Sequence, residues 1–74
     1  MLLYECEKKP CKIINVDISD EKLKTRLYEI GFFEGAKIKI LNISTLKQTL
    51  LVAVLDSCFA IKSDVAKHIE VEYD

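Results

Sequence analysis

The chain has 74 residues, of which 50% are hydrophobic and 31% are charged, and its formal net charge is −1. This length predicts one domain, residues 1–74, with a small core. No basic block offers a surface for nucleic acid, and the longest apolar run, residues 50–55, is far shorter than the roughly 20 residues that span a bilayer. The N-terminus lacks the pattern of a secretory signal, so we expect a cytoplasmic protein without membrane insertion.

The first residues predict the start of a β-sheet. Met1–Tyr4 is a short apolar segment that we expect to form a strand along a barrel. Pro10 has no amide proton and should end a pairing segment. Cys11–Val16 is predicted as the first core strand, although the adjacent Ile13 and Ile14 leave open which face points inward.

An amphipathic helix is predicted at Asp20–Ile30. Ser19 can accept an amide hydrogen bond from the first helical turn. Gly31 follows at the position where a left-handed residue commonly closes a helix. The helix should pack one apolar stripe against the sheet, formed by Leu23, Leu27 and Ile30.

The connection Phe32–Gly35 joins this helix to the next strand and carries two adjacent aromatic residues. Because two aromatic side chains in a short connection cannot both face water at low cost, we expect at least one to fill an end of the barrel. The other is a candidate for a docking surface. Gly35 gives the backbone freedom to reverse direction.

The rest of the chain alternates between short strands and turns. Strands are predicted at Ala36–Ile43, Leu50–Leu55, Cys58–Lys62 and Ile69–Tyr73. A polar loop over residues 44–49 carries one apolar residue, Leu46, a turn is expected at Asp56–Ser57, and a single helical turn starts at Ser63. Together these elements predict a mainly β fold: a small, partly closed barrel of about five strands, with one α-helix after the first core strand and a short helical turn before the last strand.

The sequence contains no nucleophile elbow, glycine-rich phosphate loop or metalloprotease pair, so we expect neither an enzyme nor a required cofactor. The weak candidates for a metal site are Cys6, Cys11, Cys58 and His68. The spacing of Cys6 and Cys11 differs from that of a zinc knuckle, so free thiols are the simpler expectation in a reducing cytosol. Thiolates would suit zinc or copper, and ferrous iron can use nitrogen and oxygen ligands as well.

Two runs of the sequence resemble the FeoA family (ferrous iron transport protein A). The run RLYEIGFFEGAKIKI is similar to the family signature of an Arg-Leu pair, an aliphatic-Gly pair and a second Gly before an alternating strand. Its matching residues are Arg26, Leu27, Ile30, Gly31, Gly35, Ile38 and Ile40. The run AIKSDVAKHIEVE looks like the end of the family sequence, with the matching residues Ala60, Ile61, Ala66, Ile69, Val71 and Glu72. The likeness spans Cys11–Glu72, but the loops depart from the family, which often has Pro in place of Glu34 and Gly near Asp56.

The resemblance implies an SH3-like barrel, similar to the C-terminal domain of metal-dependent repressors of the diphtheria-toxin-repressor type. It also implies a cytoplasmic accessory role in bacterial ferrous iron uptake, through contact with the FeoB-type membrane permease. The candidate partner-binding residues are Phe32, Phe33, Glu34, Lys37 and Leu46. The alternative is a domain that binds or senses a transition metal, with weak binding of ferrous iron or another divalent ion. Pairing of exposed sheet edges would also allow a homo-oligomer.

Overall fold

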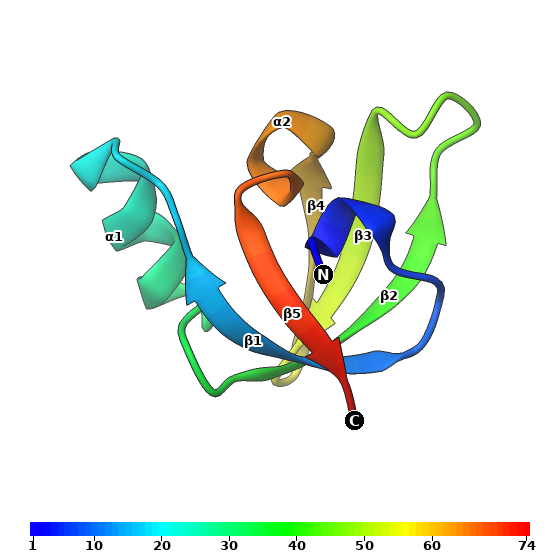
Figure 1. Cartoon of the computed structure of the whole chain (residues 1–74), viewed down its shortest axis with the longest axis horizontal. Coiled ribbons are helices and arrows are strands. Elements are labelled where there is room, and N and C mark those ends of the chain that lie inside the picture. Colours follow the sequence, from blue (N-terminus) through cyan, green and yellow to red (C-terminus); the bar gives the residue numbers. More distant parts are fainter.

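The computed structural model describes residues 1–74 and contains five strands, one main helix and two short helical turns (Figure 1). The strands are β1 (Pro10–Val16), β2 (Lys37–Ile43), β3 (Thr49–Val54), β4 (Ser57–Lys62) and β5 (Ile69–Tyr73). The main helix is α1 (Glu21–Glu29), and the short turns are α2 (Ser63–Ala66) and the 3-10 turn η1 (Leu3–Glu5). None of these helices is both long enough and apolar enough to cross a membrane.

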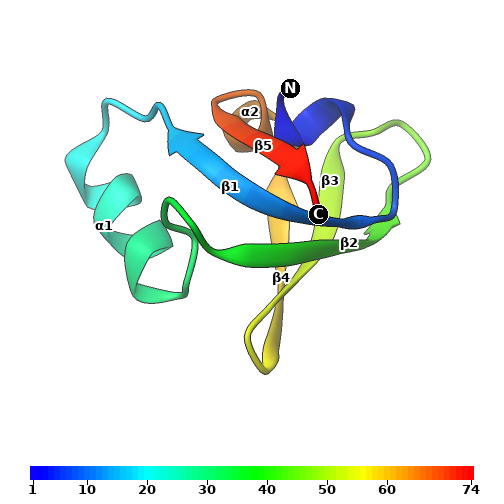
Figure 2. The ribbon, with the colours of Figure 1, turned by 60° about the horizontal axis from the view of Figure 1, so that its bottom comes forward.

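All five strands belong to one antiparallel sheet with the order β4-β3-β2-β1-β5. β4 and β5 form its two edges and do not pair with each other. Figure 2 shows β1 and β2 running across β3 and β4, so the sheet wraps around the core. The mainly β, partly closed architecture is confirmed, with α1 after the first core strand and α2 before the last strand.

Two β-bulges help the sheet to bend. The register of β1 on β5 shifts between Ile13 and Asn15, and a similar shift at Leu41 interrupts the pairing of β2 with β3. A bulge inserts one extra residue into a strand and increases the local twist. In β1 the extra residue is Ile14. It is exposed, whereas Ile13 is fully buried, and this resolves which face of the strand points inward.

Sixteen buried hydrophobic residues form the core, and every strand contributes to it. In β3 the buried positions alternate along the strand, as expected for a sheet with one face inside: Leu50, Val52 and Val54. From α1 the core receives Leu27, and Leu23 packs beside it while partly exposed. Full burial of one such side chain stabilises the folded state by about 1.5–3 kcal/mol. The sixteen core residues therefore contribute most of the stability of this short chain.

The prediction of a strand at Met1–Tyr4 is wrong. Leu3–Glu5 forms a 3-10 turn, and only Leu2 makes an isolated bridge to β5. The turn forms because the Glu5 carboxylate accepts the Leu2 amide at 3.1 Å and because Leu3 is fully buried. This segment is therefore apolar because Leu3 fills part of the core, and not because the segment forms a strand.

Pro10 begins β1 instead of ending a pairing segment. Its carbonyl accepts the amide of Asp74 at 3.3 Å, and this hydrogen bond needs no proline N–H. Proline is compatible with a strand at its first residue. The missing N–H of Pro10 therefore costs β1 no hydrogen bond at this position.

The residue that caps the start of α1 is Asp20, not Ser19. The Asp20 carboxylate accepts the amides of Lys22 and Leu23 at 3.0 and 3.3 Å. Aspartate is a preferred residue at this position, and its charge suits the positive end of the helix dipole. As a result, α1 is one residue shorter at each end than the predicted helix.

Gly31 follows the end of α1 as predicted, with a φ of +107°. The amide of Gly31 donates to the Tyr28 carbonyl at 3.2 Å, and the amide of Phe32 donates to the Leu27 carbonyl at 2.8 Å. These two hydrogen bonds define a Schellman motif. Leu27 and Phe32 both belong to the buried core, so the helix end is held by backbone and side chains together.

The turn between β3 and β4 lies one residue earlier than predicted. β3 ends at Val54 and β4 begins at Ser57, which leaves Leu55 and Asp56 as the turn. Leu55 has a φ of +56°, a conformation that glycine or asparagine adopts more readily. The sequence placed this turn one residue too late, because Leu55 continues an unbroken apolar run.

Candidate functional site

We call residues 31–37, which join α1 to β2, the corner. Its backbone is attached to β1 by two hydrogen bonds: the Gly35 amide donates to the Ile13 carbonyl at 2.8 Å, and the Ile13 amide donates to the Ala36 carbonyl at 2.9 Å. A third bond, from the Ala36 amide to the Phe33 carbonyl at 3.0 Å, closes a turn within the corner. The corner is therefore held as an extension of the sheet.

The two aromatic residues of the corner have opposite surroundings. Phe32 is fully buried and is the largest such side chain in the core, which confirms that at least one aromatic residue packs inside. Its place among the partner-binding candidates is wrong, because it offers no surface to a partner. Phe33 is 41% exposed and is available for contact.

A hydrogen bond joins the last turn of α1 to the corner. Tyr28 Oη donates to Glu34 Oε1 at 2.5 Å, and Lys24 Nζ lies 5.8 Å from the centre of the Tyr28 ring. The hydrogen bond lowers the pKa of Glu34 and raises the pKa of Tyr28, because it stabilises the charged carboxylate and the neutral phenol. Sequence reasoning did not single out Tyr28, since no regular helical spacing relates the two residues.

The structure separates Leu46 from the other partner-binding candidates. Lys37 begins β2 and is exposed beside the corner, whereas Leu46 is 75% exposed in the loop beyond the far end of β2 (Figure 1). A seven-residue strand rising about 3.3 Å per residue places roughly 20 Å of sheet between these ends. Phe33, Glu34 and Lys37 thus share one region of the surface, and Leu46 does not join it.

Leu55 is an apolar residue beside the corner that the sequence did not single out. It is 82% exposed at the β3–β4 turn. Its side chain lies next to the end of α1, since a Cβ placed on Gly31 would be 3.4 Å from Leu55 Cδ1. The signal for Leu55 in the sequence was its place beside Asp56. A tight hairpin turn favours glycine or asparagine there, and a large aliphatic residue is unusual.

Most residues of the family-like runs have architectural positions. Leu27, Ala66 and Ile69 are buried in the core. The two glycines of the first run have positive φ angles. Arg26 is exposed on α1. The first run therefore specifies how the end of α1 is joined to the sheet. The same backbone presents the exposed side chains of the corner.

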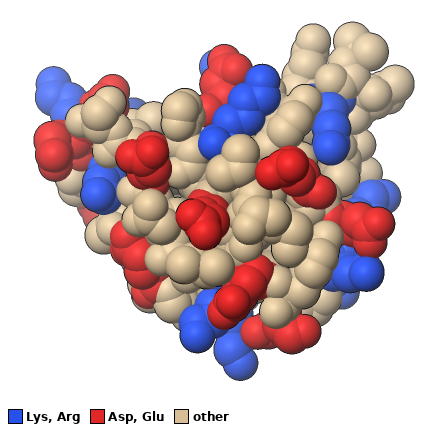
Figure 3. Space-filling view, viewed as in Figure 1, with Lys and Arg blue, Asp and Glu red and all other residues tan.

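Acidic and basic side chains are interspersed over the face of the molecule shown in Figure 3. This face has no continuous basic surface of the kind that phosphate backbones favour. The corner itself carries one residue of each sign, Glu34 and Lys37, on either side of Gly35.

The weak metal candidates do not gather into one site. Cys6 and Cys11 are buried, and the Cys6 thiol donates to the Leu2 carbonyl at 3.5 Å, while Cys58 is exposed on β4 and His68 is exposed after α2. Burial raises the pKa of Cys6 and raises the pKa of Cys11 to about 12, and only the thiolate is a good metal ligand. No group of three or more His, Cys, Asp or Glu side chains is arranged to hold a metal ion.

His68 lines a cavity of about 240 Å³ between the β1–α1 connection and the α2–β5 turn. The acidic residues of this cavity are Asp17, Asp20 and Asp64. The Asp20 carboxylate is already engaged with the amides at the start of α1. The cavity thus brings His68 and Asp64 to one region without assembling a metal site.

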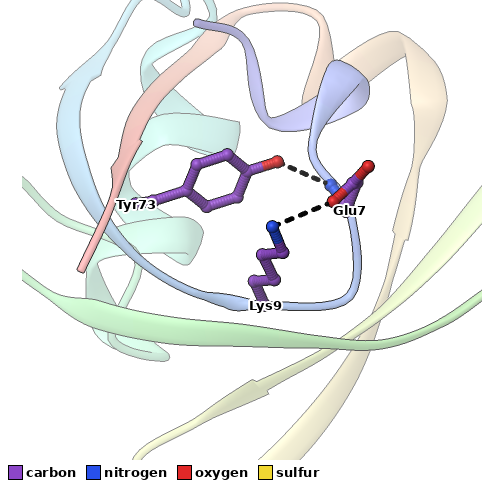
Figure 4. Close-up of polar contacts among 3 residues, drawn as sticks. All are labelled: Glu7, Lys9 and Tyr73. Carbon is purple, nitrogen blue, oxygen red and sulfur yellow. Dashed lines mark hydrogen bonds and ion pairs between the residues drawn. The ribbon is translucent and has the colours of Figure 1, made fainter.

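The loop between Cys6 and Cys11 is fastened to β5. The Glu7 amide donates to Tyr73 Oη at 3.0 Å, and Lys9 Nζ lies 3.1 Å from Glu7 Oε2 and 5.2 Å from the centre of the Tyr73 ring (Figure 4). The ion pair between Lys9 and Glu7 is exposed and contributes little to stability. Tyr73 is therefore the main link between this loop and the sheet.

The strand order, the curved sheet and the helix inserted after β1 place the molecule among small SH3-like β modules. The FeoA protein of Chlorobium tepidum superposes with a TM-score of 0.90 at 23% identity, covering 99% of this chain and 70% of that chain. FeoA of Stenotrophomonas maltophilia, solved as a zinc complex and described as a prokaryotic SH3 domain protein, gives a TM-score of 0.79 at 25% identity, covering 97% of this chain and 89% of that chain.

Sequence comparison identifies the family. The FeoA domain model matches residues 1–73. A Campylobacter jejuni protein that bears the name Fe(2+) transport protein A is 37% identical over 59 residues, which are 80% of this chain and 78% of that protein. The chain belongs to the FeoA family, which is involved in ferrous iron transport. The resemblance seen in the two sequence runs is confirmed.

Proposed function

We propose that this chain is a non-enzymatic accessory protein of bacterial ferrous iron uptake, which acts in the cytoplasm by binding the FeoB-type permease. The observation that carries the proposal is the FeoA family match over residues 1–73. The Stenotrophomonas maltophilia relative is described as a candidate activating factor of ferrous iron transport. A protein of this size would support transport most directly through contact with the protein that moves the ion.

The corner supports a binding role because it presents an exposed aromatic side chain on a fixed backbone. Phe33 is 41% exposed, and the residues that follow it are hydrogen-bonded to β1. Glu34 and Lys37 are exposed close to Phe33 in the chain and carry opposite charges. Protein interfaces commonly combine an aromatic anchor with a polar rim. We therefore place the contact with the permease at Phe33, Glu34 and Lys37.

The proposal is tested by the affinity of this chain for the full-length permease in nanodiscs, measured by biolayer interferometry. We expect Phe33→Ala to weaken binding about tenfold or more, as is typical of an interface anchor. Leu46→Ala is the matched control, because it also removes an exposed apolar side chain but at the other end of β2. It should change Kd by no more than about twofold.

Absence of wild-type binding would contradict the proposal as a whole. Weaker binding in Leu46→Ala with unchanged binding in Phe33→Ala would contradict the assignment to the corner. In cells, deletion of the gene should reduce uptake of radioactive ferrous iron, and the wild-type chain should restore it more fully than Phe33→Ala does. Normal uptake in the deletion strain would also count against the accessory role.

A second candidate function is weak binding of a divalent transition metal. The observation in its favour is the zinc complex of the Stenotrophomonas maltophilia relative. Of the four metal candidates in this chain, the accessible ones are Cys58 and His68, which lie on different elements. Calorimetry with zinc and with ferrous iron under anaerobic conditions should show weaker binding in Cys58→Ser or His68→Ala. Equal binding in the wild type and both variants would exclude a site at these residues.

A further inference from the structure

Leu55 combines two unfavourable features at the tip of the β3–β4 hairpin. Its φ is +56°, although a side chain with a Cβ is strained there and tight hairpin turns favour glycine, asparagine or aspartate. Its side chain is also 82% exposed, more than any other large hydrophobic residue of the chain. A hydrophilic residue that tolerates positive φ would remove both costs.

The fold itself gains little from the Leu55 side chain. The side chain lies beside Gly31, at 3.4 Å from a Cβ placed on that residue, and most of its surface remains in water. The turn is already defined by the pairing of Val54 with Ser57. Strained residues that the fold does not need are often kept for function.

The place of Leu55 also fits a contact role. The hairpin tip projects beyond the rest of the ribbon in Figure 2. Next to Leu55 in the turn, Asp56 is exposed and forms no ion pair, since the one salt bridge of the molecule joins Lys9 and Glu7. A projecting apolar side chain beside a free carboxylate is complementary to a hollow with an apolar floor and a basic residue at its rim.

We propose that Leu55 is an anchor residue that enters an apolar pocket with a basic rim on the cytoplasmic part of the permease. This inference rests on the proposed function, and it adds the β3–β4 turn to the docking surface at the corner. A second copy of this chain is a poorer occupant. Contact between two such tips would cover only the turns, whereas a stable interface buries roughly 800 Å² on each partner.

The test separates the strain of Leu55 from its contact role. Leu55→Asn and Leu55→Gly suit a positive φ, so both should raise the melting temperature of the isolated chain, by about 2–6 °C. The same variants should weaken binding to full-length permease in nanodiscs about tenfold or more. Leu55→Met keeps an apolar side chain and should bind within about threefold of the wild type.

Leu46→Asn is the matched control, since Leu46 is an exposed leucine in the other β-hairpin loop and has no positive φ. It should leave Kd within about twofold of the wild type. Wild-type binding with unchanged affinity in Leu55→Asn would overturn this inference and leave the proposed function standing. No wild-type binding would overturn both.

Two further results would overturn the role of Leu55. A lower melting temperature in both Leu55→Asn and Leu55→Gly would show that the fold needs this side chain. Self-association of the wild type in analytical ultracentrifugation that disappears in Leu55→Asn would make a second copy the occupant. Stable variants that remain monomeric and bind the permease weakly are the expected result.

Discussion

Tyr28 Oη donates a hydrogen bond of 2.5 Å to Glu34 Oε1, and this bond connects the last turn of α1 to the exposed part of the corner. Both residues are at the surface, yet the bond shifts the pKa values of both groups. Glu34 is therefore held in one position beside Phe33, on the surface that we propose for docking. A preorganised polar rim lowers the entropy that must be lost on binding.

The first prediction concerns this pair. Tyr28→Phe should raise the pKa of Glu34 towards its ordinary value, which NMR titration of the Glu34 side chain can measure. Because the folded pKa of Glu34 is lowered, the wild type should be more stable than Tyr28→Phe above the ordinary carboxyl value of 4.5, and this advantage should disappear as the pH falls through the folded value.

At alkaline pH the stability advantage of the wild type over Tyr28→Phe is lost as the pH rises, because the titrating group is now Tyr28. The pKa of Tyr28 is raised above its ordinary value of 10.0, so the same advantage is complete below that value and is lost as the pH rises through the folded pKa. Thr25→Ala, a change on the same exposed helix, is the control and should leave the Glu34 titration unchanged. An unchanged Glu34 pKa in Tyr28→Phe would show that the hydrogen bond does not form in solution.

The second prediction compares the two glycines. A Cβ on Gly31 would lie 2.6 Å from Val54 Cγ1, whereas a Cβ on Gly35 would meet no atom within 4 Å. Both residues have positive φ, so alanine at either one should cost about 1–2 kcal/mol of backbone strain. Gly31→Ala should cost about 1–3 kcal/mol more, because the buried Val54 must move.

Urea unfolding measures both changes. Total stability for a chain of this length is roughly 4–11 kcal/mol, so Gly31→Ala should remove a larger share of it than Gly35→Ala does. Equal losses in the two variants would show that the contact with Val54 relaxes freely.

The third prediction concerns the start of α1. Asp20→Ala removes the acceptor of the Lys22 and Leu23 amides and should destabilise the protein by about 1 kcal/mol. Ser19→Ala should change the free energy of unfolding by less than about 0.5 kcal/mol, because no hydrogen bond to the helix depends on Ser19. Thermal unfolding followed by circular dichroism measures both, and a larger loss in Ser19→Ala would reassign the cap.

The fourth prediction concerns the thiols. Cys58 is exposed and should react with iodoacetamide in the native protein, whereas Cys6 and Cys11 are buried and their raised pKa values keep them as thiols. Mass spectrometry should find one rapid alkylation at pH 8 and three after denaturation, matching the three cysteines of the chain. Cys58→Ser should abolish the rapid reaction. Rapid modification of Cys6 or Cys11 would mean that their loop opens readily.

Local patterns in the sequence were enough to predict most of the elements. Helical spacing predicted α1, alternation predicted the strands, and Gly31 predicted the helix end, because these signals depend on neighbours within a few residues. The same locality explains the errors. Ser19 and Asp20 are both good caps, and their own chemistry does not decide which side chain faces the first amides of α1.

The proposed docking surface is the part of the molecule that the sequence predicted least well. Phe32 and Phe33 are adjacent and chemically identical, so only the packing of the helix end against the sheet determines that one is buried and the other exposed. Leu46 and Leu55 both lie in hairpin loops. Only the sheet order places Leu55 beside Gly31 and Leu46 at the opposite end of β2.

The sequence by itself therefore determined the family, the succession of helix and strands and the conformation of the backbone at Gly31. These properties follow from local spacing and from the steric freedom of single residues. Only the tertiary structure decided which side chains of the corner face water and that the β3–β4 turn joins them. Burial and proximity of this kind arise from contacts between segments far apart in the chain, and no local pattern encodes them.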